Sequence, residues 1–272
     1  MRMKEPSGLN AILAPGGLTV RFQPVIALNS NGSGGPTLHA LESLMRGPKG
    51  TNLETAGVLF EYVRLKHEEN TVDRACVQTA LEGASRLPGN FLISINIHAS
   101  TLGRDPGFIP FLVSTAEEKG IPLPSLIIEI VEQKPFWEPS LQKALIRLRE
   151  HSISIALDDV GLGYSNYRMM LDCKPDYFKI DSYVVRGSHE DPYRRAVLGS
   201  IAQLASKFNA QVVAEGVEDT MDMESVAEAG IGLTQGYLFA KPLTVEEFIA
   251  SNWAHSCSSV QCPAPVSLPA VS

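Results

Sequence analysis

The sequence contains few of the features that mark secreted, membrane-bound or disulfide-rich proteins. Only 4 of its 272 residues are cysteine, and their scattered positions are typical of a reduced, cytosolic setting. No stretch approaches the roughly 18 consecutive apolar residues of a membrane-spanning helix. The first ten residues, MRMKEPSGLN, lack the apolar segment of a secretion signal. We therefore expect a cytoplasmic protein with no membrane segment.

Several common kinds of binding and catalytic site are also absent. The net charge of -7 argues against a broad electrostatic grip on DNA or RNA, so neither is expected as a partner. The chain has no P-loop and no Gly-x-Ser-x-Gly turn, and its glycine-rich DDVGLGYS segment lacks the GxGxxG spacing. His255, Cys257 and Cys262 are close in sequence, but their spacing matches none of the usual zinc-binding pairs.

The composition of the chain is typical of a globular domain. Its hydrophobic content of 44% and charged content of 19% are ordinary for a protein with a substantial core. Residues 1–17 are rich in Pro and Gly and are predicted to be a leader or linker. Residues 252–272, rich in Ser, Pro and Val, are predicted to be a disordered tail. Residues 18–251 are predicted to be the folded domain.

Strand-like and helix-like segments alternate through this domain. The run LTVRFQPVIAL is followed by NSNGSGGP, a turn that favours a hairpin, so the first two strands are expected to be antiparallel. Glu42 lies in the second. Further strands are predicted near 91–98, 126–132, 153–160, 176–181, 211–217 and 233–239. Eight such strands predict an α/β fold, a TIM-like (β/α)8 barrel whose first strand is antiparallel to the rest. A flat, doubly wound sheet is the alternative.

The helical segments between the strands have apolar positions at helical spacing. In the long segment 54–86 these positions include Val58, Tyr62 and Leu65. The segment after residue 191 begins with Asp191 as a candidate cap and Pro192 in the first turn. Its predicted apolar stripe contains Val197, Ile201, Leu204 and Phe208.

Polar side chains, mostly acidic or amide, follow one apolar strand after another, and this is the most informative pattern in the chain. The series comprises Glu42, Asn96, Glu129, Asp158, Asp159, Lys179, Asp181, Glu215 and Gln235. Each residue alone could be a salt-bridge, turn or helix-cap residue. Independent caps, however, need not recur at the same end of successive strands, and the carboxyl ends of barrel strands form the active-site face. So many converging carboxylates would repel one another unless cations lay among them, which predicts a metal-dependent enzyme.

The donor types indicate which metals would bind. Oxygen ligands favour hard cations, so Glu42, Asn96, Glu129 and Asp158 suit Mg²⁺ or Mn²⁺ better than zinc or copper. Adjacent Asp158 and Asp159 can face different ways, and one could reach a second cation. Two metals roughly 3.5–4 Å apart commonly support in-line displacement at phosphorus. A lysine among them could orient the attacking water or stabilise developing charge.

Eight segments together resemble the EAL family of cyclic di-GMP phosphodiesterases across roughly residues 18–250. They are FQPV, LESLMRG, INIHAS, IEIVEQ, ALDDVGLGYSN, FKID, VVAEGVE and TQGYLFAKPL. The resemblance implies a TIM-like barrel and hydrolysis of one 3′–5′ phosphodiester bond of cyclic di-GMP. The product would be linear 5′-phosphoguanylyl-guanosine, so the reaction would lower the level of this bacterial second messenger.

The resemblance also implies roles for individual residues. The implied ligands of one Mg²⁺ or Mn²⁺ ion are Glu42, Asn96, Glu129 and Asp158. Those serving a second ion are Asp159 and Glu215. Lys179 would engage the nucleophilic water, and Glu215 is alternatively the general base. The residues implied to contact substrate or shape the site are Gln23, Arg46, Asp181 and Gln235. Those implied to hold the loop after the fifth strand are Glu132 and Glu218.

The sequence departs from the family pattern in places. The Glu-Ala-Leu signature is Glu42-Ser43-Leu44, Val131 replaces the usual Thr, and the usual DDFGTG loop is DDVGLG. In the family this loop couples dimerisation to metal binding, so the resemblance implies a homodimer through Val160–Tyr164 and the following helix. Because the loop is altered, a receptor or scaffold that binds cyclic di-GMP without cutting it is the alternative function. A barrel metalloenzyme acting on another phosphodiester is a further one.

Overall fold

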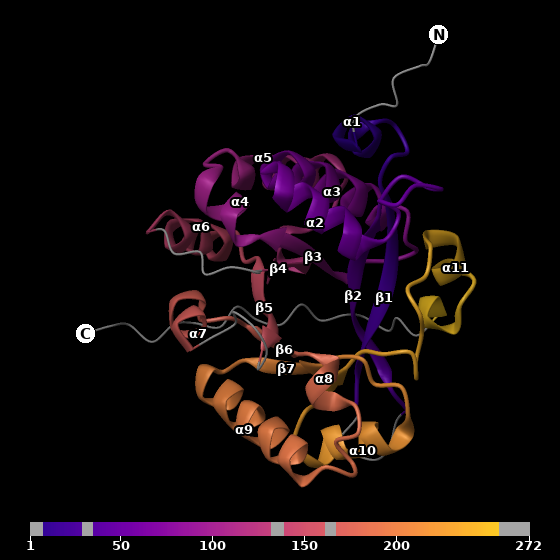
Figure 1. The fold of residues 1–272 in the computed structure, drawn as a ribbon, viewed down its shortest axis with the longest axis vertical. Coiled ribbons are helices and arrows are strands. Elements are labelled where there is room, and N and C mark those ends of the chain that lie inside the picture. Colours follow the sequence, from indigo (N-terminus) through magenta and orange to yellow (C-terminus); the bar gives the residue numbers. More distant parts are fainter. Residues whose placement is uncertain (1–7, 29–34, 132–138, 161–166, 256–272) are drawn as a thin grey trace.

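The eight strands of the protein close into one barrel in which every strand neighbours the next along the chain. A computed structural model describes residues 8–28, 35–131, 139–160 and 167–255. In Figure 1 the helices lie around the outside of the strands. The strands are β1 (Thr19–Ala27), β2 (Thr37–Arg46), β3 (Leu92–His98), β4 (Leu126–Val131), β5 (Ser154–Val160), β6 (Tyr177–Ile180), β7 (Gln211–Ala214) and β8 (Leu233–Thr234).

Strand β1 runs antiparallel to both of its neighbours, β2 and β8, and the other neighbouring pairs are parallel. A turn is sufficient to join β1 to β2, whereas parallel strands need a crossover, which here contains helices. The predicted barrel with an antiparallel first strand is therefore confirmed. Strands β7 and β8 end earlier than predicted, so Glu215 and Gln235 lie just beyond their strands.

Helices occupy most of the connections that follow β2. They are α2 (Ala56–Lys66), α3 (Glu69–Ala84), α4 (Ala99–Arg104), α5 (Phe108–Glu118), α6 (Pro139–Glu150), α7 (Tyr167–Cys173), α8 (Ser182–Val185), α9 (Pro192–Phe208) and α10 (Thr220–Glu228). Helix α1 (Gly8–Leu13) precedes β1, and α11 (Val245–Ile249) follows β8. Two short 3-10 helices are η1 (Leu123–Ser125) and η2 (Asn252–His255). Within the ranges that the structure describes, no helix has both the length and the apolar character needed to cross a membrane.

The long helical segment near 54–86 is two helices rather than one. His67 adopts a left-handed conformation (φ 57°) that ends α2, and α3 begins two residues later. The buried face of α2 contains Leu59 and Val63, while Val58 and Leu65 are 44% and 73% exposed. Val58 and Leu65 were therefore wrong as members of the apolar face, whereas Tyr62 packs against the core as predicted.

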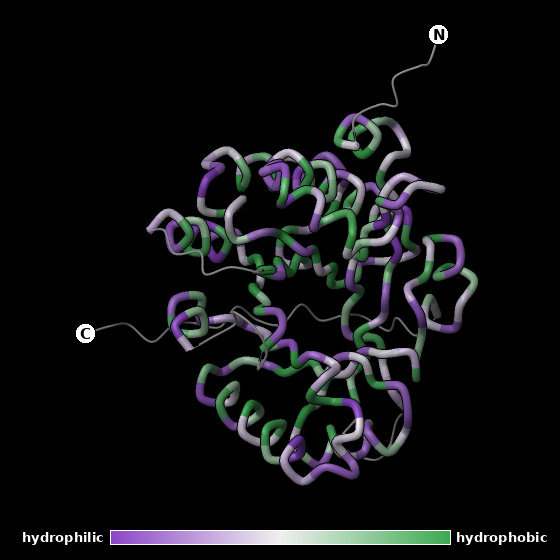
Figure 2. Tube along the Cα trace, viewed as in Figure 1, coloured by the Kyte–Doolittle hydropathy of each residue, from purple (hydrophilic) through white to green (hydrophobic). Residues whose placement is uncertain are grey.

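Helix α9 begins as predicted, with the Asp191 side chain accepting hydrogen bonds from the backbone N–H groups of Tyr193 and Arg194. Its buried residues are Leu198, Ile201 and Ala205, whereas Val197 is 41% exposed. Val197 was therefore wrong as a member of the stripe, whereas Ile201 is buried and Leu204 and Phe208 pack against the core as predicted. In Figure 2 hydrophobic and hydrophilic positions alternate along this helix, as expected for one face on the barrel and one in solvent.

The core has two separate apolar parts. The larger part fills the space between the outer faces of the strands and the helices. The smaller part lies inside the barrel and takes one buried residue from each strand: Val25, Ala40, Leu92, Ile127, Ala156, Tyr177, Val213 and Leu233. This interior layer fills the barrel, and polar residues pack against it on the side of the carboxyl ends of the parallel strands.

Candidate active site

A ring of eight polar side chains lies directly above the interior apolar layer. Each member is two residues beyond an interior apolar residue, or two before it in the antiparallel β1, and residues two apart in a strand share a face. The members are Gln23, Glu42, Ser94, Glu129, Asp158, Lys179, Glu215 and Gln235. Asn96 lies two residues further along β3. The structure therefore brings together seven of the predicted site residues plus Asn96, and it adds Ser94.

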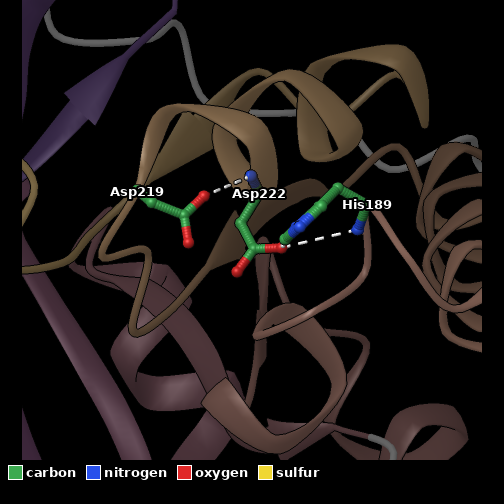
Figure 3. Close-up of side chains that lie close together, drawn as sticks. All are labelled: His189, Asp219 and Asp222. Carbon is green, nitrogen blue, oxygen red and sulfur yellow. Dashed lines mark hydrogen bonds and ion pairs between the residues drawn. The ribbon is translucent and has the colours of Figure 1, made fainter.

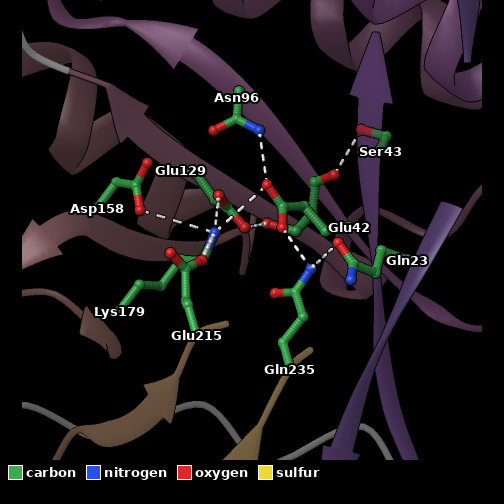
Figure 4. Close-up of polar contacts among 10 residues, drawn as sticks. Gln23, Glu42, Ser43, Asn96, Glu129, Asp158, Lys179, Glu215 and Gln235 are labelled. Carbon is green, nitrogen blue, oxygen red and sulfur yellow. Dashed lines mark hydrogen bonds and ion pairs between the residues drawn. The ribbon is translucent and has the colours of Figure 1, made fainter. Parts of the chain in front are cut away.

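Lys179 is at the centre of this ring and is only 3% exposed. Its Nζ lies 2.6 Å from Glu129 Oε2 and 2.7 Å from Glu215 Oε1. The same nitrogen is 3.4 Å from Glu42 Oε1 and 3.7 Å from Asp158 Oδ1. Figure 4 shows these side chains converging from different strands. One ammonium group therefore holds four carboxylates together at the mouth of the barrel.

Amide side chains position the carboxylate of Glu42. Asn96 Nδ2 donates to Glu42 Oε1 at 3.0 Å, and Gln235 Nε2 donates to Glu42 Oε2 at 2.7 Å. Gln235 Nε2 also donates to Gln23 Oε1 at 3.1 Å, and Gln23 Nε2 donates to the Ala240 carbonyl at 3.1 Å. These hydrogen bonds connect β1 and the residue after β8 to the Glu42 carboxylate, at the place where the first and last strands meet and close the barrel.

The ring contains more carboxylates than positively charged groups, and this excess affects their pKa values. Burial raises the pKa of Glu129 to about 8, and the Glu42 charge adds to the effect. Burial likewise raises the pKa of Glu215 well above its usual value. Burial opposes the charge of Lys179, but the Glu129 and Glu215 carboxylates raise its pKa well above the ordinary range. For Glu42, burial would raise the pKa, yet Lys179 and the amide donors bring it below the usual value.

Asp158 and Asp159 are adjacent in sequence but both approach Glu215. One carboxylate oxygen from each of the three residues lies within 4.8 Å of the others. Consecutive side chains of a regular strand point to opposite faces. Here Asp159 has φ 52°, and the pairing of β5 with β6 shifts register between Leu157 and Val160, so the backbone turns Asp159 towards its neighbour. Burial and the charge of Asp158 raise the pKa of Asp159 to about 6.

Two glycines allow the backbone beside the ring to pack closely. Gly216 follows Glu215 with φ 67°, and a Cβ there would lie 2.4 Å from the Ser182 Cβ. Gly236 follows Gln235, and a Cβ there would lie 1.9 Å from the carbonyl oxygen of Val217. A side chain at either position would displace the backbone that carries Glu215 or Gln235. The two glycines therefore determine where these ring members lie.

Three other predicted residues lie at the rim rather than in the ring. Arg46 ends β2, and its Nη1 donates to the Met45 carbonyl at 2.8 Å. Asp181 caps α8 by accepting from the Tyr183 N–H at 2.6 Å. Strand β6 ends at Ile180, so the strand alternation that directs Lys179 into the ring does not extend to Asp181.

Glu218, the other rim residue, forms an ion pair with Arg186, with 2.6 Å between Oε1 and Nη2. Its predicted contact with the loop after β5 concerns residues outside the described ranges. Glu132 and the loop segment 161–164 also lie outside them, as do Cys257 and Cys262. Val160 is the last residue of β5 and is fully buried.

A second group of potential ligand atoms is found away from the ring, at His189, Asp219 and Asp222 (Figure 3). Asp222 accepts from the N–H of Gly187 at 2.9 Å and lies 2.8 Å from His189 Nδ1. Asp219 caps α10 through the N–H of Asp222. These contacts join the segment before α9 to α10, which accounts for the cluster as a structural connection.

The ring fits the chemistry of divalent cations. Its lining residues border a pocket of about 290 Å³ that includes Glu42, Asp158, Lys179, Glu215 and Gln235. The donors are oxygens of carboxylates and amides, which hard cations such as Mg²⁺ and Mn²⁺ prefer. Bound divalent ions would neutralise the negative charge that the carboxylates of the ring have in excess of Lys179. Gln235 Oε1 is buried without a hydrogen-bond partner among the described residues, so it is available to accept one from a ligand.

Comparison with known proteins gives consistent findings. The model of the family described as the EAL domain matches residues 9–242. Cyclic di-GMP phosphodiesterase PdeL of Escherichia coli (strain K12) is 32% identical over 168 residues, which cover 61% of this chain and 46% of that protein. The crystal structure of a standalone versatile EAL protein from Vibrio cholerae O395, in its c-di-GMP bound form, has a TM-score of 0.73. Its identity is 25%, and the match covers 84% of this chain and 93% of that one.

A manganese/cy-diGMP complex of Klebsiella pneumoniae BlrP1 at pH 6 is also similar in fold. Its TM-score is 0.74 at 25% identity, with 86% of this chain and 58% of that one covered. The matches span 33%, 46% and 58% of the length of three curated relatives, so each of those proteins contains further sequence. The two solved structures share the overall fold of the barrel with this chain.

Proposed function

The chain belongs to the EAL domain family, and we propose that it is a metal-dependent phosphodiesterase acting on cyclic di-GMP. The reaction is hydrolysis of one 3′–5′ phosphodiester bond to give linear 5′-phosphoguanylyl-guanosine. The observation that carries the proposal is the convergence of Glu42, Glu129, Asp158 and Glu215 around Lys179 at one mouth of the barrel. The names of the curated relatives support the choice of substrate.

The donor set supports two cation positions. Glu42, Asn96, Glu129 and Asp158 would hold one Mg²⁺ or Mn²⁺ ion, and Asp159 with Glu215 would serve a second. Bound divalent ions lower the pKa of water and neutralise charge on the phosphate oxygens. The proximity of oxygens from Asp158, Asp159 and Glu215 supports the second position.

The chain's own residues supply orientation and charge. Lys179 has three N–H donors and is held by Glu129 and Glu215. In the proposed reaction it would direct a water molecule towards the phosphate and stabilise the negative charge that develops there. Glu215 is the neighbouring carboxylate, and its raised pKa suits the acceptance of a proton from that water.

Amide and rim residues would recognise the dinucleotide. Gln235 presents a buried carbonyl oxygen without a partner among the described residues, and Gln23 holds its amide nitrogen in place. Arg46 would meet a phosphate oxygen with its planar donors. Asp181 stands at the rim as the cap of α8 and would border the bound ligand.

Turnover of purified protein with Mg²⁺, Mn²⁺ or neither tests this proposal. We expect the linear dinucleotide to appear, by chromatography, only with metal, and added Ca²⁺ to inhibit because its longer bonds place water poorly. Glu42→Ala and Lys179→Ala should abolish turnover, whereas the exposed matched controls Glu228→Ala and Lys207→Ala should not. Folded protein with no turnover would contradict the proposal. Tight binding of intact cyclic di-GMP would instead indicate a receptor, and cleavage of other phosphodiesters a different substrate.

The protein is also proposed to form a homodimer through the loop around Val160–Tyr164 and helix α7; because Val160 itself is buried, α7 would supply the contact surface. Two large side chains of α7 support this: Tyr167 is 73% exposed and Leu171 is 64% exposed. Sedimentation of wild-type protein should show a dimer, and Leu171→Asp should shift it to a monomer. A matched change on another surface, Tyr193→Asp at an 82% exposed position, should not. A monomeric wild type at high concentration would contradict the dimer.

A further inference from the structure

Ser94 is the only member of the polar ring that is neither charged nor an amide. It occupies the ring position of β3, where its short side chain cannot reach the centre. Asn96, two residues on, extends from the same face of β3 and donates to Glu42. Strand β3 therefore contributes at two levels, with an amide above and a hydroxyl below.

The hydroxyl of Ser94 contacts a predicted metal ligand directly. Ser94 Oγ donates to Glu129 Oε1, and Lys179 Nζ is 2.6 Å from Glu129 Oε2. Ser94 and Glu129 are 3% and 2% exposed. The carboxylate thus has one donor on each oxygen, from two different strands. Two donors on two oxygens determine both the position and the rotation of a carboxylate plane.

A second buried hydroxyl provides an internal comparison. Ser43 is 2% exposed and its Oγ donates to the Ser94 backbone carbonyl at 2.5 Å. It lies next to Glu42 on the opposite face of β2, towards the helices, because successive side chains of a strand alternate. Ser43 therefore contacts the backbone of β3 and not the Glu129 carboxylate.

We propose that Ser94 is a positioning residue that orients the Glu129 carboxylate for a divalent cation. The inference rests on the proposed function, since that function makes Glu129 a ligand. Hydrogen-bond partners of metal ligands typically affect metal affinity by about 10–100-fold when they are removed. Without Ser94, Lys179 would be the one remaining donor to Glu129 among the described residues, and the carboxylate could rotate about that single contact.

Binding of Mn²⁺ in the absence of nucleotide tests this inference separately from turnover. Isothermal titration of Ser94→Ala should show Mn²⁺ affinity about 10–100-fold below wild type. The Mn²⁺ electron paramagnetic resonance spectrum should also change, because it reports ligand geometry. Ser94→Thr retains a hydroxyl and should restore most of the affinity. The control Ser43→Ala removes an equally buried hydroxyl and should stay within about twofold of wild type.

Each result has a definite meaning. Wild-type Mn²⁺ affinity and spectrum in Ser94→Ala would overturn the positioning role, as would an equal loss in Ser43→Ala. Failure of wild-type protein to bind Mn²⁺ would overturn the proposed function instead. If Ser94→Ala does not fold, Ser94→Thr and Ser94→Cys decide the question: affinity should follow donor strength, being near wild type for Thr and reduced for Cys. Equal affinity in these two variants would contradict the inference.

Discussion

Replacing Glu129 by glutamine should stabilise the metal-free protein at alkaline pH. The carboxyl of Glu129 has a pKa of about 8 in the folded chain, against 4.5 for the ordinary value. The folded state therefore holds this proton more tightly than the unfolded state. The protonated Glu129 carboxyl therefore contributes to the free energy of unfolding. This contribution is fully present below about pH 4.5 and is lost as the pH rises to about 8, because the folded protein must then bury an additional negative charge.

The magnitude follows from the two pKa values. At about 1.4 kcal/mol per pH unit, the range from 4.5 to about 8 corresponds to about 5 kcal/mol of unfolding free energy. About 3 kcal/mol of this would already be lost at pH 7. For a domain of this size, 5 kcal/mol is about 10–20 °C in melting temperature. Glu129→Gln keeps the shape of the side chain and does not ionise.

Urea unfolding in EDTA between pH 5 and 9 measures the difference between Glu129→Gln and wild type. The advantage of the variant should grow steadily with pH and level off near pH 8 to 9. Excess Mn²⁺ should reverse it, because only wild type keeps the full ligand set. Glu228→Gln, at an exposed position of α10, is the matched control and should show a flat difference. A flat difference for Glu129→Gln in EDTA would refute the charge-surplus argument.

Three further outcomes are expected. Lys179→Met should lower kcat by about 10²–10³-fold while Lys207→Met leaves it unchanged, and a small loss in turnover by Lys179→Met would remove the lysine from the chemistry. Gly236→Ala should lower the melting temperature, because its Cβ would overlap the Val217 carbonyl. The control Gly199→Ala lies in open space on α9 and should instead raise the free energy of unfolding by about 0.5–1 kcal/mol. Asp73→Ala should lower the free energy of unfolding, measured in urea, by about 3–5 kcal/mol. The reason is that fully buried Asp73 accepts hydrogen bonds from the His98 ring, the His98 backbone N–H and the Thr101 hydroxyl. An unchanged urea midpoint would show that these hydrogen bonds do not contribute to stability.

The sequence alone determined the fold class and most of the residues at the mouth of the barrel. Alternating strand and helix patterns are local signals, and a polar residue after each strand is visible without coordinates. The antiparallel start was predicted from the turn NSNGSGGP, and β1 does pair antiparallel with β2 and β8. The Asp191 cap of α9 was predicted correctly because capping depends on only a few neighbouring residues.

The tertiary structure decided what depends on contacts between distant segments. Val58 and Leu65 of α2 and Val197 of α9 were wrongly assigned to the apolar faces, because apolar periodicity alone does not specify which side of a helix meets the barrel. Ser94 was missed because a lone serine in a strand has no special signal until Glu129 lies beside it. The convergence of Asp158 and Asp159 required the left-handed turn at Asp159. The raised pKa of Glu129 likewise depends on burial and on charges from other strands, which exist only after the barrel closes.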